Sequence, residues 1–219
     1  MKFYFLSVIL SLFVCSITFS QVTESDRLFK TATDLVKERK YAEALTIFEN
    51  LANNNEYDAQ YNLAFLISSG KGTTKNYREA LYWALLSMLG KIEKGEKLSE
   101  ELIKILPEKE SEDVREEVLE HLIARFERKD ADVLMQIGDF YLSVLEEEDF
   151  ENAYLWFNVA SAVGIENADE KRDKVEKKLE PDTIIKVQLA ARERHKEFIN
   201  GKKPNNKKET KSTEKEYES

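Results

Sequence analysis

The chain has 219 residues, of which 42% are hydrophobic and 34% are charged, and its formal net charge at pH 7 is −9. An acidic surface repels phosphate backbones and anionic lipid, so nucleic acid and membrane surfaces are not expected partners. The 7 Gly and 3 Pro are too few to supply the turns of an all-β protein of this length. We therefore expect an all-α fold.

The first twenty residues differ from the rest of the chain. Lys2 precedes an apolar run over residues 3–19, and polar sequence begins at Gln21. This pattern predicts a signal peptide over residues 1–20 and a periplasmic or secreted protein, with an uncleaved anchor as the alternative. Cys15, the single cysteine, follows Phe13 and Val14 rather than the small residues of a lipidation site. The mature chain then has no cysteine, and we expect neither a disulfide nor membrane insertion after cleavage.

Residues 21–57 contain a first pair of predicted helices. Apolar residues recur there at helical spacing. The pattern is similar to a tetratricopeptide-repeat helix pair, at Leu28, Ala32, Leu35, Tyr41, Ala44 and Phe48.

Two later segments, residues 58–129 and 130–200, repeat one another. The first contains Leu63, Ala64, Ala80, Trp83, Gly90 and Pro107, and the second contains Ile137, Gly138, Ala153, Trp156, Gly164 and Pro181. The interval from alanine to tryptophan and the interval from glycine to proline are the same in both segments. Each segment opens with a predicted helix–turn–helix, with Asp58 and Asp130 as candidate N-caps. The small residues at 64, 138, 80 and 153 are expected to let the two helices approach closely. Trp83 and Trp156 are expected in the core between neighbouring helices.

These segments resemble the Sel-1-like repeat, a relative of the tetratricopeptide repeat. The resemblance rests on Gly70-x-Gly72, Ala80-x-x-Trp83, Ala153-x-x-Trp156 and Gly164. The second segment lacks the two turn glycines, and Glu146 to Asp149 occupy that turn. The resemblance implies an α-solenoid of antiparallel helix pairs and a role as an adaptor that binds other proteins.

Further helices are predicted after each repeat. They cover residues 98–106 and 114–126 in the first segment, and 168–179 and 183–198 in the second, which gives about ten helices in all. Residues 201–219 hold six Lys and four Glu without apolar spacing, so we expect a disordered tail. The body over residues 21–200 then carries a net charge of −12.

Residues with catalytic or ligand-binding potential form no complete motif. Ser68-x-x-Lys71 resembles the first motif of β-lactam-binding enzymes, but the two companion motifs are absent. Gly70-Lys71-Gly72 lacks the preceding glycine of a phosphate-binding loop. His121 and His195, the two histidines, do not have the spacing of a zinc site. We therefore expect no catalytic residue, no cofactor and no metal.

The predicted function is that of an exported scaffold that holds a protein or peptide partner in a groove lined by the first helix of each pair. The candidate partner-binding residues on those helices, expected to be exposed, are Gln60, Tyr61, Gln136 and Phe140. The alternatives are an envelope enzyme acting on β-lactam or cell-wall compounds, as the resemblance to cysteine-rich relatives implies, and a structural module of a larger complex. A pocket with converging titratable residues would favour the enzyme.

Overall fold

The computed structural model describes residues 23–201, and within this range every regular element is an α-helix. The ten helices are α1 (Glu24–Lys37), α2 (Tyr41–Asn53), α3 (Tyr57–Ser69), α4 (Tyr77–Leu89), α5 (Glu93–Ile103), α6 (Glu108–Glu127), α7 (Val133–Ser143), α8 (Phe150–Val163), α9 (Ala168–Glu176) and α10 (Pro181–Asn200). The predicted all-α fold is confirmed. The expected signal peptide, and the expected tail from residue 202 onward, lie outside the described residues.

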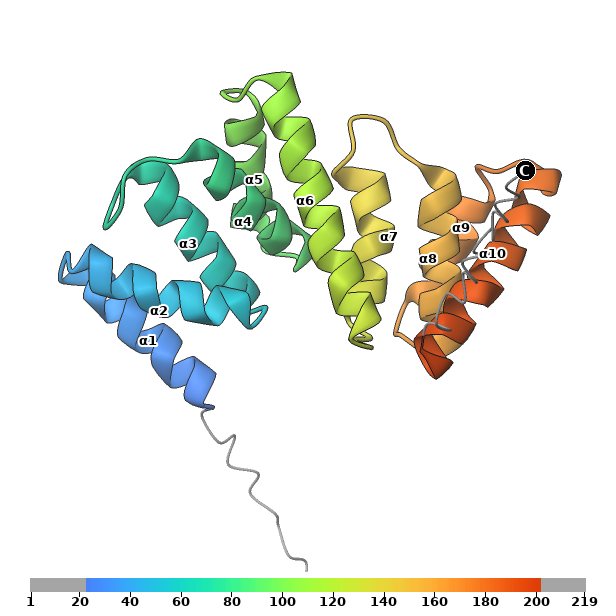
Figure 1. Cartoon of the computed structure of the whole chain (residues 1–219), viewed down its shortest axis with the longest axis horizontal. Coiled ribbons are helices and arrows are strands. Elements are labelled where there is room, and N and C mark those ends of the chain that lie inside the picture. The colour runs from blue at the N-terminus through green and yellow to red at the C-terminus, as the bar shows by residue number, and fades with distance from the viewer. Residues whose placement is uncertain (1–22, 202–219) are drawn as a thin grey trace, which may run out of the picture.

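The helices form an elongated arc, with α1 and α2 at one end and α9 and α10 at the other (Figure 1). Helices α1 to α4 pack one against the next, and α6 packs on α7 to join the two repeated segments. In the first segment both α5 and α6 pack on α4, and in the second both α9 and α10 pack on α8. The solenoid of stacked helices is therefore confirmed, and the two segments share one packing scheme.

The helices after each repeat differ in one respect from the prediction. We expected residues 98–106 and 114–126 to form a pair with each other, but α5 and α6 each pack mainly on α4. The reason lies in α4, which buries side chains on most of its circumference, at Ala80, Leu81, Trp83, Ala84, Leu85, Leu86, Ser87 and Leu89. A helix that is apolar all round needs neighbours on several sides, and a single antiparallel partner cannot cover it.

The tryptophan helices begin in the same way in both segments. Asn76 Oδ1 accepts a hydrogen bond from the Glu79 backbone N–H at 3.2 Å, and Asp149 Oδ1 accepts one from the Asn152 N–H at 2.9 Å. Each cap stands seven residues before its tryptophan. These side chains satisfy backbone donors that the first turn of a helix leaves unpaired.

The N-cap predictions for the preceding helices were wrong. Asp58 lies inside α3, whose N-cap residue is Glu56, and the N-cap residue of α7 is Asp132 rather than Asp130. Neither cap residue makes a side-chain capping bond. Asp130 accepts a hydrogen bond from the Asp132 N–H at 3.1 Å and shapes the turn before the helix instead.

The close approach of paired helices is confirmed at the small residues. Ala64, Ala80 and Ala153 are buried, and a Cβ atom added at Gly138 would lie 2.4 Å from the Phe157 ring. Only a residue without a side chain lets α7 and α8 pack at this distance. The glycine therefore sets the separation of the two helices.

Candidate functional site

Three of the four candidate partner-binding residues are not exposed. Gln60 is 1% exposed, Phe140 is 1% exposed and Gln136 is 6% exposed, so the expectation of exposure was wrong for them. Tyr61 is half-buried and reaches the surface. A helix between two neighbours presents little of its surface to solvent, so its polar residues need not face outward.

Gln136 is buried because it holds a buried charge. Arg125 of α6 is 3% exposed, and its guanidinium donates to Gln136 Oε1 at 2.7 Å and to Asp130 Oδ2 at 2.8 Å. A buried arginine is tolerated only when its donors are paired. Gln136 therefore fixes α7 against α6.

Tyr61 lines a cavity of about 400 Å³ between α3 and α5. Phe65 and Ile105 form its exposed apolar edge, and the Lys94 ammonium lies 5.8 Å from the centroid of the Tyr61 ring. This cation–π contact holds the ring against α5. Of the four candidates, Tyr61 keeps an accessible position.

A longer depression runs along the exposed side of α6, which stands near the middle of the arc (Figure 1). Three adjoining cavities of about 430, 430 and 280 Å³ share wall residues there, and we call them together the α6 groove. Its apolar floor consists of Leu119, Ile123, Tyr141, Leu145 and Leu155, with Phe140 beneath one part of it. Its acidic rim consists of Glu112, Glu116, Glu120, Glu127 and Glu146.

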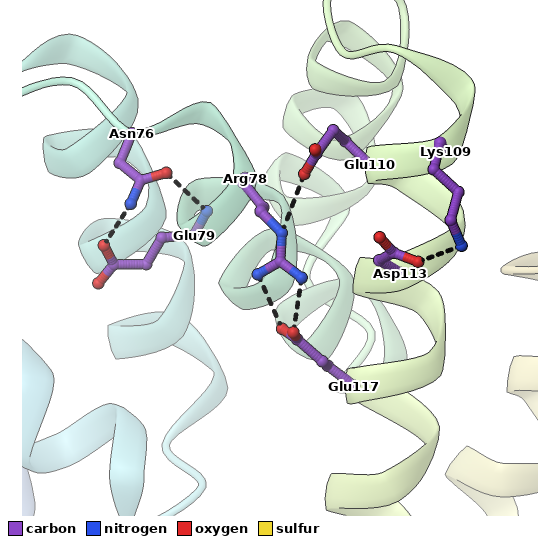
Figure 2. Close-up of polar contacts among 7 residues, drawn as sticks. All are labelled: Asn76, Arg78, Glu79, Lys109, Glu110, Asp113 and Glu117. Carbon is purple, nitrogen blue, oxygen red and sulfur yellow. Dashed lines mark hydrogen bonds and ion pairs between the residues drawn. The ribbon is translucent and has the colours of Figure 1, made fainter.

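The groove owes its acidic rim to the way α6 is attached to α4. Arg78 of α4 binds Glu117 of α6 through two hydrogen bonds of 2.6 and 3.2 Å, and Glu110 through one of 3.1 Å (Figure 2). The hydrogen bonds that Arg78 donates to Glu117 raise the pKa of Arg78. Because successive helical residues are 100° apart, Glu110 and Glu117 face Arg78 from a strip of α6 that lies beside the rim glutamates.

Unlike Glu110 and Glu117, the rim glutamates in the middle of α6 are not bound by Arg78. Glu112, Glu116 and Glu120 are exposed and make no side-chain hydrogen bond or ion pair within residues 23–201. Lys109, one turn before the rim, is bound to Asp113 at 2.5 Å on the same helix (Figure 2). The groove therefore presents a row of negative charge beside apolar side chains.

No family model matches this chain. No curated protein matches it either. One solved structure that it is similar to is a protective antigen present in uropathogenic Escherichia coli strains, described as displaying an SLR fold, which is the fold that the Sel-1-like resemblance implies. The two are 19% identical with a TM-score of 0.39, and the match covers 80% of this chain and 30% of that one. The chain thus spans less than a third of that protein, and the assignment of the fold rests on the helices described above.

The Ser68-x-x-Lys71 motif does not form a nucleophile and base. Ser68 Oγ donates to the Phe65 carbonyl oxygen at 3.0 Å, and the Lys71 ammonium lies 5.3 Å from the Phe65 ring centroid and 5.5 Å from that of Tyr41. A lysine that activates a serine must reach its hydroxyl. The geometry of this turn thus gives no support to the enzyme alternative.

The titratable groups of the groove do not suggest proton-transfer chemistry. Burial raises the pKa of Tyr141, so its hydroxyl stays protonated. Within residues 23–201 there is no cluster of three or more His, Cys, Asp or Glu that could hold a metal ion. In the same range, no helix has the length and apolar character needed to cross a membrane.

Proposed function

We propose that this chain is an exported helical-repeat scaffold that binds a basic, amphipathic segment of a partner protein in the α6 groove. The observation that carries the proposal is an apolar floor beside a row of rim glutamates, of which Glu112, Glu116 and Glu120 make no ion pair or side-chain hydrogen bond within residues 23–201. Export rests on the sequence of residues 1–20, which reads as a signal peptide.

The chemistry of the groove selects the kind of partner. Leu119 and Ile123 lie one helical turn apart, so a partner helix with apolar residues at i and i+3 or i+4 would cover both. Lysine or arginine residues beside that stripe would then face the rim glutamates. Complementary charge of this kind gives specificity and speeds association more than it adds affinity.

The size of the groove fits such a segment. Helix α6 has 20 residues, which corresponds to a length of about 30 Å. A partner helix of four to five turns would lie along it. The body of −12 attracts a basic partner from a distance, and this attraction is screened beyond about 8 Å at physiological salt.

The test uses a fluorescein-labelled synthetic peptide of Leu and Lys at amphipathic helical spacing as the probe. Fluorescence anisotropy should show that it binds the mature chain. Glu120→Lys should weaken binding by about three- to tenfold, because it replaces attraction at the rim with repulsion. Higher salt should weaken binding to the unchanged protein.

The matched control is Glu49→Lys on α2. Glu49 is also exposed, is also without a hydrogen bond or ion pair in the described part of the chain, and lies away from the groove. It changes the net charge by the same amount and should leave probe binding within about twofold of the unchanged protein. If both variants weakened probe binding equally, the effect would come from net charge alone. That result would contradict specific binding in the α6 groove.

A further inference from the structure

The outward face of α10 exposes more apolar surface than a terminal helix normally does. Ile185 is 60% exposed, Leu189 is 62% exposed and Ile199 is 58% exposed. On the opposite side, Val187 and Phe198 are buried. Each unit of a solenoid normally covers the face of the unit before it, and a terminal helix is usually polar outside. The face of α10 around Ile185 and Leu189 is therefore an uncovered packing surface.

Within residues 23–201, no other element covers this face, since Ile185 and Leu189 stay exposed there. Helix α1, the other end of the arc, lies at the far end of the molecule (Figure 1). Residues 202–219 contain Tyr217 as their one aromatic residue and no Leu, Ile, Val, Phe or Met. A segment of this composition has no apolar stripe with which to pack on a helix.

The charges beside the apolar residues indicate what covers the face. Asp182, Ile185, Leu189 and Arg192 follow one another at spacings of three, four and three residues, so they lie on one side of α10. Asp182 and Arg192 are exposed and form no ion pair within residues 23–201. Both stand five residues from Val187, one on each side. The stripe therefore has a negative charge at one end and a positive charge at the other, at equal distances from its centre.

From this pattern we propose that the occupant is a second copy of this chain, with the two α10 helices antiparallel and the two-fold axis beside Val187. In this register Ile185 faces Leu189 of the partner subunit, and Asp182 faces Arg192 of the partner subunit. The symmetry repeats each contact, which gives one apolar centre between two Asp–Arg ion pairs. A parallel pairing would set like charges against each other.

The dimer is weak because the overlap is short. Residues 181–193 overlap, a length of about 20 Å, and two apolar side chains from each subunit form the centre. This interface falls below the area of stable dimers, and we expect a dissociation constant on the order of 10⁻⁵ to 10⁻⁴ M.

The dimer leaves the α6 groove open. Arg194, the residue of α10 that lines the groove, follows Ile185 by nine residues, which places it on the opposite side of the helix. The dimer therefore carries two open grooves, and the proposal does not depend on what they bind.

Sedimentation equilibrium of the mature chain, at about 10–500 µM, tests the dimer. The unchanged protein should show a monomer–dimer equilibrium, and Leu189→Glu should be monomeric throughout. Ile199→Glu is the matched control, because Ile199 is equally exposed on the same helix but lies outside the overlap. It should leave the association constant unchanged.

The charge register is tested by exchange. Asp182→Arg and Arg192→Asp should each weaken the dimer about three- to tenfold, since each sets like charges against each other. The double variant should restore it. Circular dichroism monitors folding in every case, and all of these side chains are exposed. A chain that stays monomeric at every concentration, a double variant that stays weak, or equal loss in Ile199→Glu would each overturn the proposal.

Discussion

Trp83 and Trp156 occupy equivalent positions in α4 and α8, and both are buried. Trp83 packs edge-to-face on Tyr82 with ring centroids 5.0 Å apart, and Trp156 packs on Phe126 at the same distance. The prediction that both lie in the core is confirmed. Their surroundings differ, because Trp156 and Phe126 also form the end of the α6 groove, while Trp83 is not among the groove residues.

Removal of the Trp83 ring should therefore cost stability. We expect Trp83→Ala to lower the free energy of unfolding by about 3–5 kcal/mol, as large-to-small changes in a core do. Urea unfolding followed by circular dichroism measures this. Trp83→Phe keeps an aromatic ring at the site and should cost less than Trp83→Ala. An unchanged midpoint in Trp83→Ala would contradict a core role.

At the scale of elements, His121 links three parts of the arc. It lies on α6; its Nδ1 atom is 3.0 Å from the Tyr82 hydroxyl on α4, and its Nε2 atom is 3.4 Å from Asn55 Oδ1 in the turn between α2 and α3. Burial lowers the pKa of His121, and the charges of Arg125 and Arg128 lower it further. The folded state therefore holds the neutral imidazole.

This shift makes stability depend on pH in a defined direction. Above about pH 6.5, the ordinary pKa of histidine, both states hold neutral His121 and it contributes no pH dependence. As the pH falls below that value the unfolded chain takes up a proton that the folded chain resists, so stability decreases. Urea unfolding of the unchanged protein and His121→Gln, at about pH 7.5 and 5.5, should show a larger loss in the unchanged protein.

The control for this experiment is His195→Gln on α10. It makes the same substitution but leaves His121 in place, so the pH dependence that His121 contributes should remain. If His121→Gln loses as much stability on acidification as the unchanged protein, the link between His121 and acid sensitivity is wrong.

The sequence predicted the helices well but not which of their faces are buried. Ala80-x-x-Trp83 and Ala153-x-x-Trp156 recur at matching spacings, and such duplication identifies a helix pair with little ambiguity. Gln136 was misjudged because its burial depends on Arg125, eleven residues away on another helix. A buried polar group whose partner comes from another element leaves no periodic signal in its own helix.

For the whole molecule, the groove could not be predicted because no single helix contains it. Its floor comes from α6, α7 and α8, and the glutamates of α6 look like an ordinary solvated face in the sequence. The attachment of α6 to α4 through Arg78 pairs Glu110 and Glu117 and leaves Glu112, Glu116 and Glu120 without an ion pair in the described residues. The negative net charge of the body could be predicted from the sequence. The sequence did not predict that several of its glutamates lie beside an apolar floor.

The body and the tail have opposite charge, which raises the question of which one recognises the partner. The body over residues 21–200 carries −12, and residues 201–219 carry +2 with Tyr217 as their one aromatic residue. If recognition lies in the groove, deletion of residues 202–219 should leave the helical spectrum and the melting temperature unchanged. The deletion keeps Gly201, whose N–H donates to the Glu197 carbonyl oxygen at 2.8 Å at the end of α10.

Binding of the Leu/Lys probe to the truncated chain should then match that of the full mature chain, with the same dependence on salt. Charged tails do serve as recognition elements in other proteins. Loss of binding with an intact helical spectrum would move recognition to the tail. A marked gain would mean that the basic residues from Lys202 to Lys211 compete with the probe for the rim glutamates, because a tethered segment acts at about millimolar effective concentration. Either change would contradict a groove that works independently of the tail.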